Sequence, residues 1–156
     1  LQYTGGTTGV AKGAMLTHAN MVANMQQVGA WITTQLVPGK EVAIAALPLY
    51  HIFSLTACAM VFIRIGANGI LVTNPRDMPG FVKLLKSVPF SILPGVNTLF
   101  NGLLNTPGFA ELDFSHLKVT LGGGMAVQRA VAEKWKQVTG CTLAEAYGLT
   151  ETSPGV

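Results

Sequence analysis

The chain has 156 residues, enough for one domain with a buried core, and 49% of them are hydrophobic while only 11% are charged. The formal net charge is +3, and the basic residues are scattered without aromatics between them, which argues against a nucleic-acid partner. Cys58 and Cys141 lie in apolar segments without zinc-type spacing, so we expect a buried, reduced pair in a reducing, cytoplasmic compartment.

The first feature along the chain is the loop YTGGTTGVAKG at residues 3–13, with four glycines, three threonines and one lysine. Glycines let successive backbone N–H groups point at one anion, threonine hydroxyls add donors, and Lys12 adds a cation. The loop therefore predicts a phosphate cradle. It is not a Walker A loop, because Ala11 precedes Lys12 and Gly13 follows it. A flexible hairpin tip would explain the glycines but not the hydroxyls and the ammonium.

Helical and strand-like segments alternate after this loop. Thr17 is a plausible N-cap for a helix with Met21, Met25, Val28 and Ile32 on one face. Apolar runs predict strands at residues 42–47, 69–73, 90–93, 118–121 and 142–146. The intervening segments predict a helix at residues 52–65, a helix capped by Asp77, a helix opened by Asn97, and a helix carrying Val127, Val131, Trp135 and Val138.

This alternation predicts a doubly wound, three-layer α/β fold with a mostly parallel sheet and helices on both faces. Residues 1–35 would form the phosphate-loop hairpin, with two antiparallel strands, and the first helix; residues 42–151 would form the core of a single subdomain spanning residues 1–156. The longest apolar run, residues 52–63, is short of the ~20 residues that span a bilayer, so we expect a buried helix. No signal peptide is visible, and both ends look cut, so we expect a fragment of a larger protein.

Three polar or glycine-rich loops follow predicted strands. Residues 48–53 read PLYHIF, residues 122–125 read GGGM, and residues 147–151 read YGLTE. Because ligands bind beyond the carboxyl ends of parallel strands, these loops are expected to meet at one site. The glycine run is not a dinucleotide fingerprint, since no glycine falls at its last position.

Each of these residues has a simpler alternative when it is taken alone. Glu151 is the candidate metal ligand beside a phosphate site, but an isolated glutamate there would more often be solvated. His51 on its own would more often be a packing or capping residue than a catalytic one, and with Phe53 it could equally gate a substrate. Tyr147 could be core or a stacking face for a base.

Taken together, the loops resemble the adenylate-forming superfamily of acyl-CoA synthetases, adenylation domains and firefly-type luciferases. YTGGTTGVAKG is similar to that family's YTSGTTGxPKG phosphate loop, and LPLYHIF and YGLTE match two further motifs in the same order. The stretches NPRDMPG, GVNTLFNGLLN and GGGMAVQ resemble bacterial long-chain fatty acid–CoA ligases. The resemblance covers the whole chain.

The resemblance implies an acid–thiol ligase that uses ATP, Mg2+ and coenzyme A to convert a long-chain fatty acid to acyl-adenylate and then acyl-CoA. The residues implied to hold the β- and γ-phosphates are Thr4, Gly5, Gly6, Thr7, Thr8, Gly9 and Lys12. Thr4 and Glu151 would place the metal, and Thr150 would contact the α-phosphate. The adenine would be framed by Gly123, Gly124, Tyr147 and Gly148, and the acyl group by His51, Phe53 and Val96. The catalytic set is then His51, Thr150 and Glu151.

Two departures and one absence qualify this implication. Gly5 stands where the family has serine, which removes a hydroxyl, and Ala11 stands where it has proline, which loosens the loop. Family members carry a ribose-gripping aspartate, a hinge and a C-terminal domain with a catalytic lysine further along, so we expect the catalytic C-terminal domain to be absent and this chain alone to be inactive.

Two other kinds of function stay open at this point. The first is another acyl or aryl acid–CoA ligase, or a carrier-protein adenylation domain. The second is a non-catalytic α/β module that binds a nucleotide or a partner. Peripheral membrane contact on the inner face and homo-oligomerisation of the parent protein are left open as well.

Overall fold

The computed structural model describes residues 1–4 and 10–156, and its centre is a five-stranded sheet. The strands are β3 (Val42–Ala45), β4 (Asn68–Leu71), β5 (Ile92–Gly95), β6 (Val119–Gly122) and β7 (Leu143–Glu145). Their order is β4-β3-β5-β6-β7, and every neighbouring pair is parallel. The predicted α/β fold with a parallel sheet is therefore confirmed, with strand boundaries that differ by one or two residues from those predicted.

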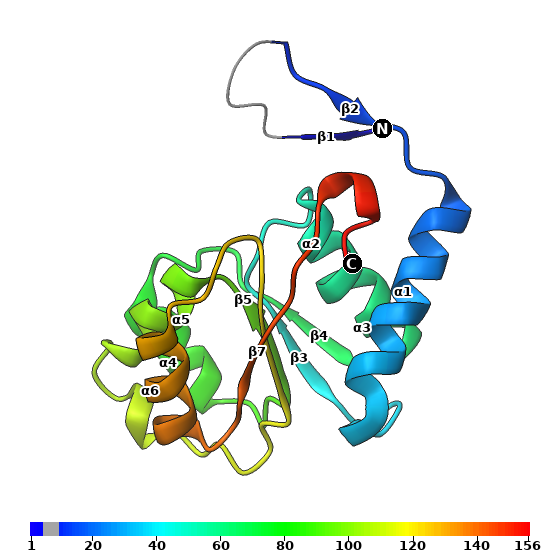
Figure 1. Cartoon of the computed structure of the whole chain (residues 1–156). Coiled ribbons are helices and arrows are strands. Elements are labelled where there is room, and N and C mark those ends of the chain that lie inside the picture. The colour runs from blue at the N-terminus through cyan, green and yellow to red at the C-terminus, as the bar shows by residue number, and fades with distance from the viewer. Residues whose placement is uncertain (5–9) are drawn as a thin grey trace.

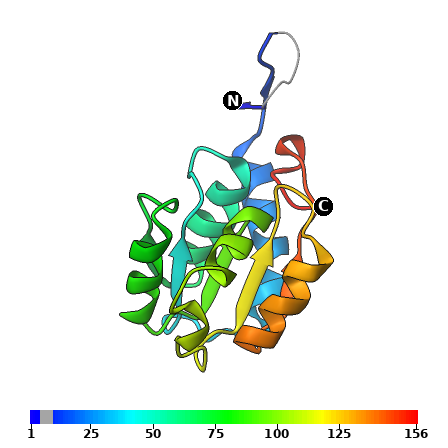
Figure 2. The same ribbon diagram turned by 90° about the vertical axis from the view of Figure 1, so that its left-hand side faces the viewer.

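Helices cover both faces of this sheet (Figure 1, Figure 2). One face carries α1 (His18–Ile32), η1 (Thr33–Gln35), α2 (Ile52–Ser54), η2 (Leu55–Met60) and α3 (Val61–Arg64). The other face carries α4 (Met78–Lys86), α5 (Asn97–Leu104), the short η3 (Phe109–Glu111) and α6 (Arg129–Thr139). The chain moves from β3 to β4 on one side and then returns to β5 on the other side of β3. This reversal opens the sheet edge between the loops, where α/β proteins bind ligands.

Each face of the sheet has its own apolar core. The larger core contains Trp135, Phe100 and Phe109, and the Phe100 and Trp135 rings meet edge to face at a centroid distance of 4.8 Å. The smaller core packs Cys58 and Phe62 against β3. Burial of strands on both faces accounts for the high hydrophobic content of a chain with so few charges.

Local signals placed several helix starts correctly. The Thr17 hydroxyl accepts a hydrogen bond from the Asn20 N–H at 3.1 Å, and the Asp77 carboxylate accepts one from the Gly80 N–H at 3.0 Å. These side chains satisfy N–H groups that have no partner within the first turn. Both predicted caps are confirmed.

Three local expectations need correction. The helix predicted over residues 52–65 is continuous but contains the π-helical segment η2, a widening that apolar periodicity does not reveal. Val127 lies before α6, because Gln128 is the N-cap; it is buried beside Gly122 instead of lying on the helix. Cys58 is buried, which raises the pKa of its thiol to about 11, but Cys141 is only half-buried; both are free thiols.

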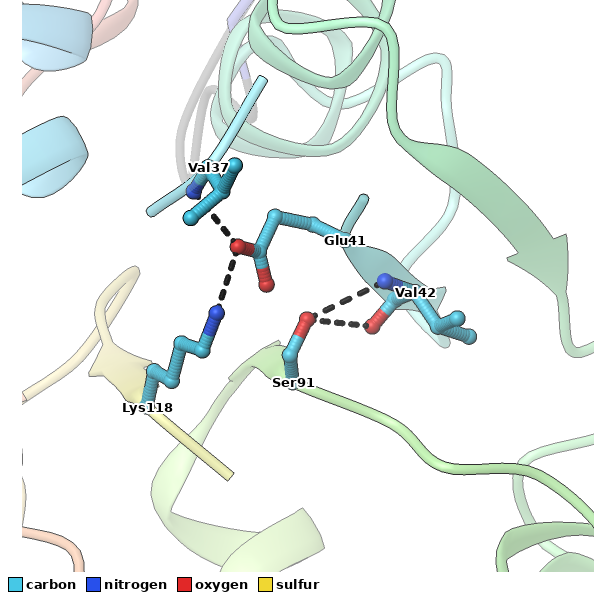
Figure 3. Close-up of polar contacts among 5 residues, drawn as sticks. All are labelled: Val37, Glu41, Val42, Ser91 and Lys118. Atoms are coloured by element: carbon cyan, nitrogen blue, oxygen red, sulfur yellow. Dashed lines mark hydrogen bonds and ion pairs between the residues drawn. The ribbon is translucent and has the colours of Figure 1, made fainter. Parts of the chain in front are cut away.

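A buried polar cluster closes the amino edge of the sheet (Figure 3). Glu41, which is 2% exposed, accepts hydrogen bonds from the Lys118 ammonium and the Val37 N–H, both at 2.7 Å. Ser91 bonds to the backbone of Val42, at 3.0 Å to its N–H and 3.2 Å to its carbonyl. Burial alone would raise the pKa of the Glu41 carboxyl, but the groups that donate to it hold that pKa below its usual value.

The amino-terminal hairpin extends away from the body of the molecule (Figure 1, Figure 2). It pairs β1 (Gln2–Tyr3) with β2 (Gly13–Ala14) in antiparallel fashion, as the sequence predicted. Within the described residues, every helix is too short or too polar to cross a membrane.

Candidate functional site

A cleft of about 1290 Å³ opens at the carboxyl edge of the sheet and continues along β6 and β7 beside α1. It exists because α4, α5 and α6 all lie on the opposite face, so the α1 side of β6 and β7 stays open in the part of the chain that the structure describes. Its walls come from the amino-terminal hairpin, α1, the loop after β3, the loop after β6 and the segment after β7.

Most of the described residues that the sequence singled out line this cleft. They are Thr4, His51, Phe53, Gly123, Gly124, Tyr147, Gly148, Thr150 and Glu151. Lys12 and Val96 are not among the lining residues. Gly5, Gly6, Thr7, Thr8 and Gly9 lie outside the described residues. The three predicted loops and the base of the hairpin thus share one concave surface, while the role of each residue stays a prediction.

The hairpin is fixed at its base. The N–H of Thr4 donates to the Lys12 carbonyl at 2.8 Å, and the Thr4 hydroxyl donates to the same oxygen at 3.2 Å. The side-chain Nε2 of Gln2 donates to the Tyr50 carbonyl at 2.6 Å and so connects the hairpin to the loop after β3. The Lys12 side chain is exposed. Because the Thr4 hydroxyl donates its proton to the Lys12 carbonyl, its oxygen keeps lone pairs for a ligand.

His51 begins the helical segment after β3. Its Nδ1 accepts a hydrogen bond from the Phe53 N–H at 3.2 Å, which makes it the N-cap of α2. Neutral imidazole with an accepting Nδ1 carries its proton on Nε2, so the exposed ring presents an N–H donor. His51 is therefore a capping residue and a cleft residue at once.

The glycine loop after β6 permits close packing against this segment. A Cβ on Gly123 would lie 3.0 Å from Cζ of the buried Phe53, too close for an undisturbed ring. Gly124 has φ +75°, a conformation that favours glycine, and a Cβ there would contact Val96 at 3.6 Å. The bare backbone at these positions leaves the space in front of Phe53 open to a planar or apolar ligand.

Residues 147–156 fold back on themselves at the end of β7. The Leu149 N–H donates to the Pro154 carbonyl at 3.0 Å, and the Val156 N–H donates to the Tyr147 carbonyl at 3.2 Å. A Cβ on Gly148 would overlap the Pro154 carbonyl, so only glycine allows this approach. The 3₁₀ turn η4 (Thr150–Thr152) forms the tip and carries an exposed Glu151.

Two polar residues at the cleft were not singled out from the sequence. Asn24 in α1 and Thr56 in η2 both line the cleft and are 5% and 0% exposed. Each bonds to the segment after β7. A signal was present: Asn24 falls on the same helical face as Met21 and Val28, and Thr56 interrupts an apolar run. Polar residues in such places need a partner, and here the partner is distant in sequence.

The donor set of the cleft limits what metal it could hold. Among the described residues there is no group of three or more His, Cys, Asp and Glu side chains suited to a metal ion. Two carboxylates, Glu145 and Glu151, line the cleft, together with hydroxyl oxygens that include those of Thr4 and Thr150. Mg2+ is commonly bound by one or two carboxylates together with substrate phosphates, so this donor set fits Mg2+ and a phosphorylated ligand rather than a preformed metal cage.

Comparison with known proteins gives consistent results. The family described as AMP-binding enzyme matches residues 1–156. A long-chain-fatty-acid–CoA ligase of Escherichia coli O157:H7 is 60% identical over 154 residues, which is 99% of this chain and 28% of that protein. The chain therefore spans about 28% of the length of this curated relative.

Two solved structures share the fold. The inhibitor-bound N-terminal domain of FACL13 from Mycobacterium tuberculosis aligns with a TM-score of 0.84 at 25% identity, over 97% of this chain and 37% of that one. ATP-bound MatB from Rhodopseudomonas palustris aligns with a TM-score of 0.79 at 28% identity, over 97% of this chain and 29% of that one.

Proposed function

The chain belongs to the AMP-binding enzyme family, and on this premise we propose that it forms the nucleotide- and acyl-binding part of a long-chain fatty acid–CoA ligase. The similarity to long-chain-fatty-acid–CoA ligases at 60% identity supports the choice of substrate class. The observation that carries the proposal is the meeting of Thr4, His51 and the Thr150–Glu151 turn in one cleft, although they lie up to 147 residues apart in sequence.

The proposed reaction has two steps. A fatty carboxylate oxygen attacks the α-phosphorus of ATP, and the bond to the β-phosphate oxygen breaks to release pyrophosphate. The coenzyme A sulfur then attacks the acyl carbonyl carbon, its proton is lost to solvent, and AMP leaves. Joining two anions requires alignment and charge cancellation more than a general base. A Ser-His-Asp set would indicate hydrolysis instead, and the described residues that line the cleft include no such set.

We assign the phosphate end of the cleft to the hairpin and to the tip after β7. Thr4, Lys12 and the loop between them bind the β- and γ-phosphates, and Thr150 contacts the α-phosphate. Lys12 reaches the phosphates from the exposed base of the hairpin. The long, flexible lysine side chain suits this role, because its compact charge needs no fixed plane.

Thr4 and Glu151 are the proposed ligands of Mg2+. The donor set fits, because Glu151 is exposed in the cleft and a carboxylate with a hydroxyl supplies the hard oxygen atoms that the ion prefers. When bound, the ion would neutralise negative charge on the departing pyrophosphate. Glu151 itself contributes by fixing the position of that charge at the tip of η4.

The remaining cleft residues are assigned to the organic groups. Gly123, Gly124, Tyr147 and Gly148 frame the adenine, where the exposed Tyr147 ring offers a stacking surface. His51 and Phe53 border the acyl site, and Val96 belongs to the wall behind Gly124. The proposed role of His51 is to donate its Nε2–H to the reacting carboxylate or to gate the entry of the fatty acid.

Cellular context follows from this chemistry as part of the proposal. A reducing cytoplasm suits the free thiols of Cys58 and Cys141. A long-chain substrate partitions into bilayers, so peripheral contact of the complete protein with the inner membrane face is compatible with the reaction, as is homo-oligomerisation.

The test uses the complete reading frame that encodes this chain. The purified protein is given palmitate, ATP and Mg2+, and fatty-acid-dependent exchange of pyrophosphate into ATP is measured, followed by thioester formation after coenzyme A is added. We expect both activities. Exchange with an aromatic acid but not with palmitate would identify another acid ligase, and exchange with an amino acid would identify a carrier-protein adenylation domain.

A second experiment, a binding titration, separates a nucleotide-binding chain from a module that binds only a protein partner. A titration of the 156-residue chain with ATP, with and without Mg2+, should show metal-dependent binding; a module that only binds a protein partner would show none. We expect no acyl-CoA from the 156-residue chain alone, since it spans about 28% of the length of the long-chain-fatty-acid–CoA ligase to which it is similar. Thioester formation by this chain would overturn the proposal that it forms only the nucleotide- and acyl-binding part of the ligase.

A further inference from the structure

The segment of residues 147–156, called here the terminal loop, carries Thr150 and Glu151 but is bonded mainly to itself. It follows β7, which is an edge strand of the sheet. Within the described residues, the side chains of other elements that hydrogen-bond to it are Asn24 from α1 and Thr56 from η2. The location of Glu151 relative to the rest of the cleft therefore depends on these two contacts.

Asn24 pairs with the backbone of Gly155 through both ends of its amide. Its Nδ2 donates to the Gly155 carbonyl at 2.9 Å, and its Oδ1 accepts from the Gly155 N–H at 3.1 Å. The side chain is buried, so both bonds are shielded from water. A Cβ on Gly155 would lie 3.2 Å from Val28 and 3.4 Å from Asn24 Oδ1, so the loop lies tightly against α1. Only a carboxamide supplies a donor and an acceptor in this geometry.

Thr56 makes the second contact from the π-helical segment. Its hydroxyl donates to the Ser153 carbonyl at 3.0 Å. A helical threonine usually directs this bond to the carbonyl four residues earlier, but here it leaves its own helix. π-helical turns often occur at functional sites. Thr56 is fully buried, so the bond fixes the loop without access of water.

α1 connects this anchor to the opposite part of the cleft. The helix begins at His18, shortly after β2 of the hairpin that contains Thr4 and Lys12, and its start is fixed by Thr17 and Asn20. The helix α1 thus follows β2 of the hairpin closely in the chain and is bonded to the loop that carries Glu151 (Figure 1). Displacement of either loop would change the distance between the two proposed metal ligands.

We propose that Asn24 and Thr56 are positioning residues, which hold Glu151 at the place where it binds the metal–phosphate group; this inference rests on the proposed function. Neither residue touches substrate in this role. Loss of either contact should weaken the use of Mg-ATP more than the use of palmitate, because Glu151 and the proposed adenine residues Tyr147 and Gly148 belong to the terminal loop, whereas the proposed acyl wall comes from other segments of the cleft.

The experiment compares matched variants of the complete protein. Thr56→Val keeps the shape and removes the hydroxyl, and Thr56→Ser keeps the hydroxyl. Asn24→Asp keeps the shape and replaces the donor with an oxygen that faces the Gly155 carbonyl. Thr106→Val is the control, because it removes a similar bond, from the Thr106 hydroxyl to the Gly102 carbonyl at 2.8 Å, away from the cleft.

We expect Thr56→Val and Asn24→Asp to raise the Mg-ATP concentration at half-maximal pyrophosphate exchange roughly tenfold, about the effect of one lost buried hydrogen bond. The KM for palmitate should change less than twofold by the same reasoning. Thr56→Ser should restore wild-type values. Hydrogen exchange of the backbone amides in residues 147–156 should speed up roughly tenfold in the two variants and not in Thr106→Val.

Two results would overturn the inference. One is variants that match Thr106→Val in Mg-ATP dependence and in hydrogen exchange; the other is equal losses in both KM values with a lowered Tm, which indicate general unfolding. A wild-type protein without fatty-acid-dependent exchange would refute the proposed function instead. In that case, hydrogen exchange and direct Mg-ATP titration of the same variants would still decide whether the two contacts position the loop.

Discussion

At the amino edge of the sheet Glu41 is enclosed and bonded to Lys118 and Val37 (Figure 3). At the carboxyl edge, by contrast, Glu151 is exposed at the tip of η4 in the cleft. Both glutamates lie beyond the ends of strands of the same parallel sheet, but their surroundings differ. A carboxylate whose partners are all within the protein contributes to the fold. One left without enclosing partners, on a concave edge, is available to a ligand.

This comparison predicts opposite consequences for the same kind of substitution. Lys118 lines the end of the cleft before β6, at the opposite end of the strand from the carboxyl edge, so changes at the amino edge should lower stability and leave the activity of folded molecules intact. Changes at the carboxyl edge should lower activity and leave stability intact. Four experiments test the separation, from the largest expected effect to the smallest.

Substitution of Glu151 should have the largest effect. In the complete protein we expect Glu151→Gln to slow fatty-acid-dependent pyrophosphate exchange by about 10²–10³-fold, because it removes the proposed carboxylate ligand of the ion that would stabilise the developing negative charge. The free energy of unfolding should change by less than about 0.5 kcal/mol, since the side chain is exposed. Exchange kinetics and urea denaturation measure the two quantities.

Glu111→Gln serves as the control for charge, because Glu111 is an exposed glutamate outside the cleft. It should leave both quantities unchanged. Wild-type exchange rates in Glu151→Gln would remove Glu151 from the site, and a large loss of stability would place it with Glu41 as a structural residue.

Removal of the charge opposite Glu41 should have the second largest effect. Lys118→Met leaves a buried carboxylate without its ammonium, and we expect a loss of about 2 kcal/mol in the free energy of unfolding. The Lys118 side chain is 36% exposed, so solvent already weakens the pair and the loss should stay below that of a fully buried one. Urea denaturation of the chain at neutral pH measures it.

The matched control is Lys134→Met, which removes an exposed lysine from α6. It should change stability by less than about 0.5 kcal/mol. Equal stability of Lys118→Met and Lys134→Met would contradict the assignment of Glu41 to the fold. Reduced activity per folded molecule in Lys118→Met would contradict the separation of the two edges.

The pH dependence of the same variant should sharpen this result. The pKa of the Glu41 carboxyl lies below its usual value of 4.5. Near these pKa values, the carboxyl therefore binds fewer protons on average in the folded chain than in the unfolded chain. The stabilisation is therefore complete above about pH 4.5 and is lost as pH falls through the lower, folded pKa.

The difference in stability between wild type and Lys118→Met should accordingly shrink as pH is lowered from about 7 to about 3.5. Urea midpoints at several pH values measure it, and groups common to both proteins cancel in the difference. A difference that stays constant or grows on acidification is incompatible with an ionised Glu41 held by Lys118.

These residues also show what could be predicted from sequence. Strands, helices and the caps at Thr17 and Asp77 depend on neighbours within a few positions, so periodicity and capping rules located them. The cleft could be anticipated too, because parallel strands bring their following loops to one edge. Contacts between distant residues could not be predicted: Asn24 with Gly155 spans 131 positions and Lys118 with Glu41 spans 77.

The misassigned details have the same physical origin. The polar Thr56 within an apolar run indicates that its hydroxyl needs a partner, but the π-helical turn at η2 leaves the apolar pattern unchanged, so the run does not indicate that this partner lies outside the helix. Val127 fits the spacing of α6 but is held before the helix, where it packs at Gly122. In both places tertiary contacts decide the conformation and local pattern does not.

The smallest effect is expected at a surface ion pair that matches the buried one in length. Arg129 Nε lies 2.7 Å from Glu133 Oε1, the same distance as that between Lys118 Nζ and Glu41 Oε1. The two surface side chains are 92% and 63% exposed, so water and salt screen their attraction. Glu133→Gln should therefore change the free energy of unfolding by less than about 0.5 kcal/mol, measured by urea denaturation as for Lys118→Met. A loss as large as that of Lys118→Met would mean that bond length and not enclosure sets the strength of these pairs, and the contrast between the two edges of the sheet would lose its physical basis.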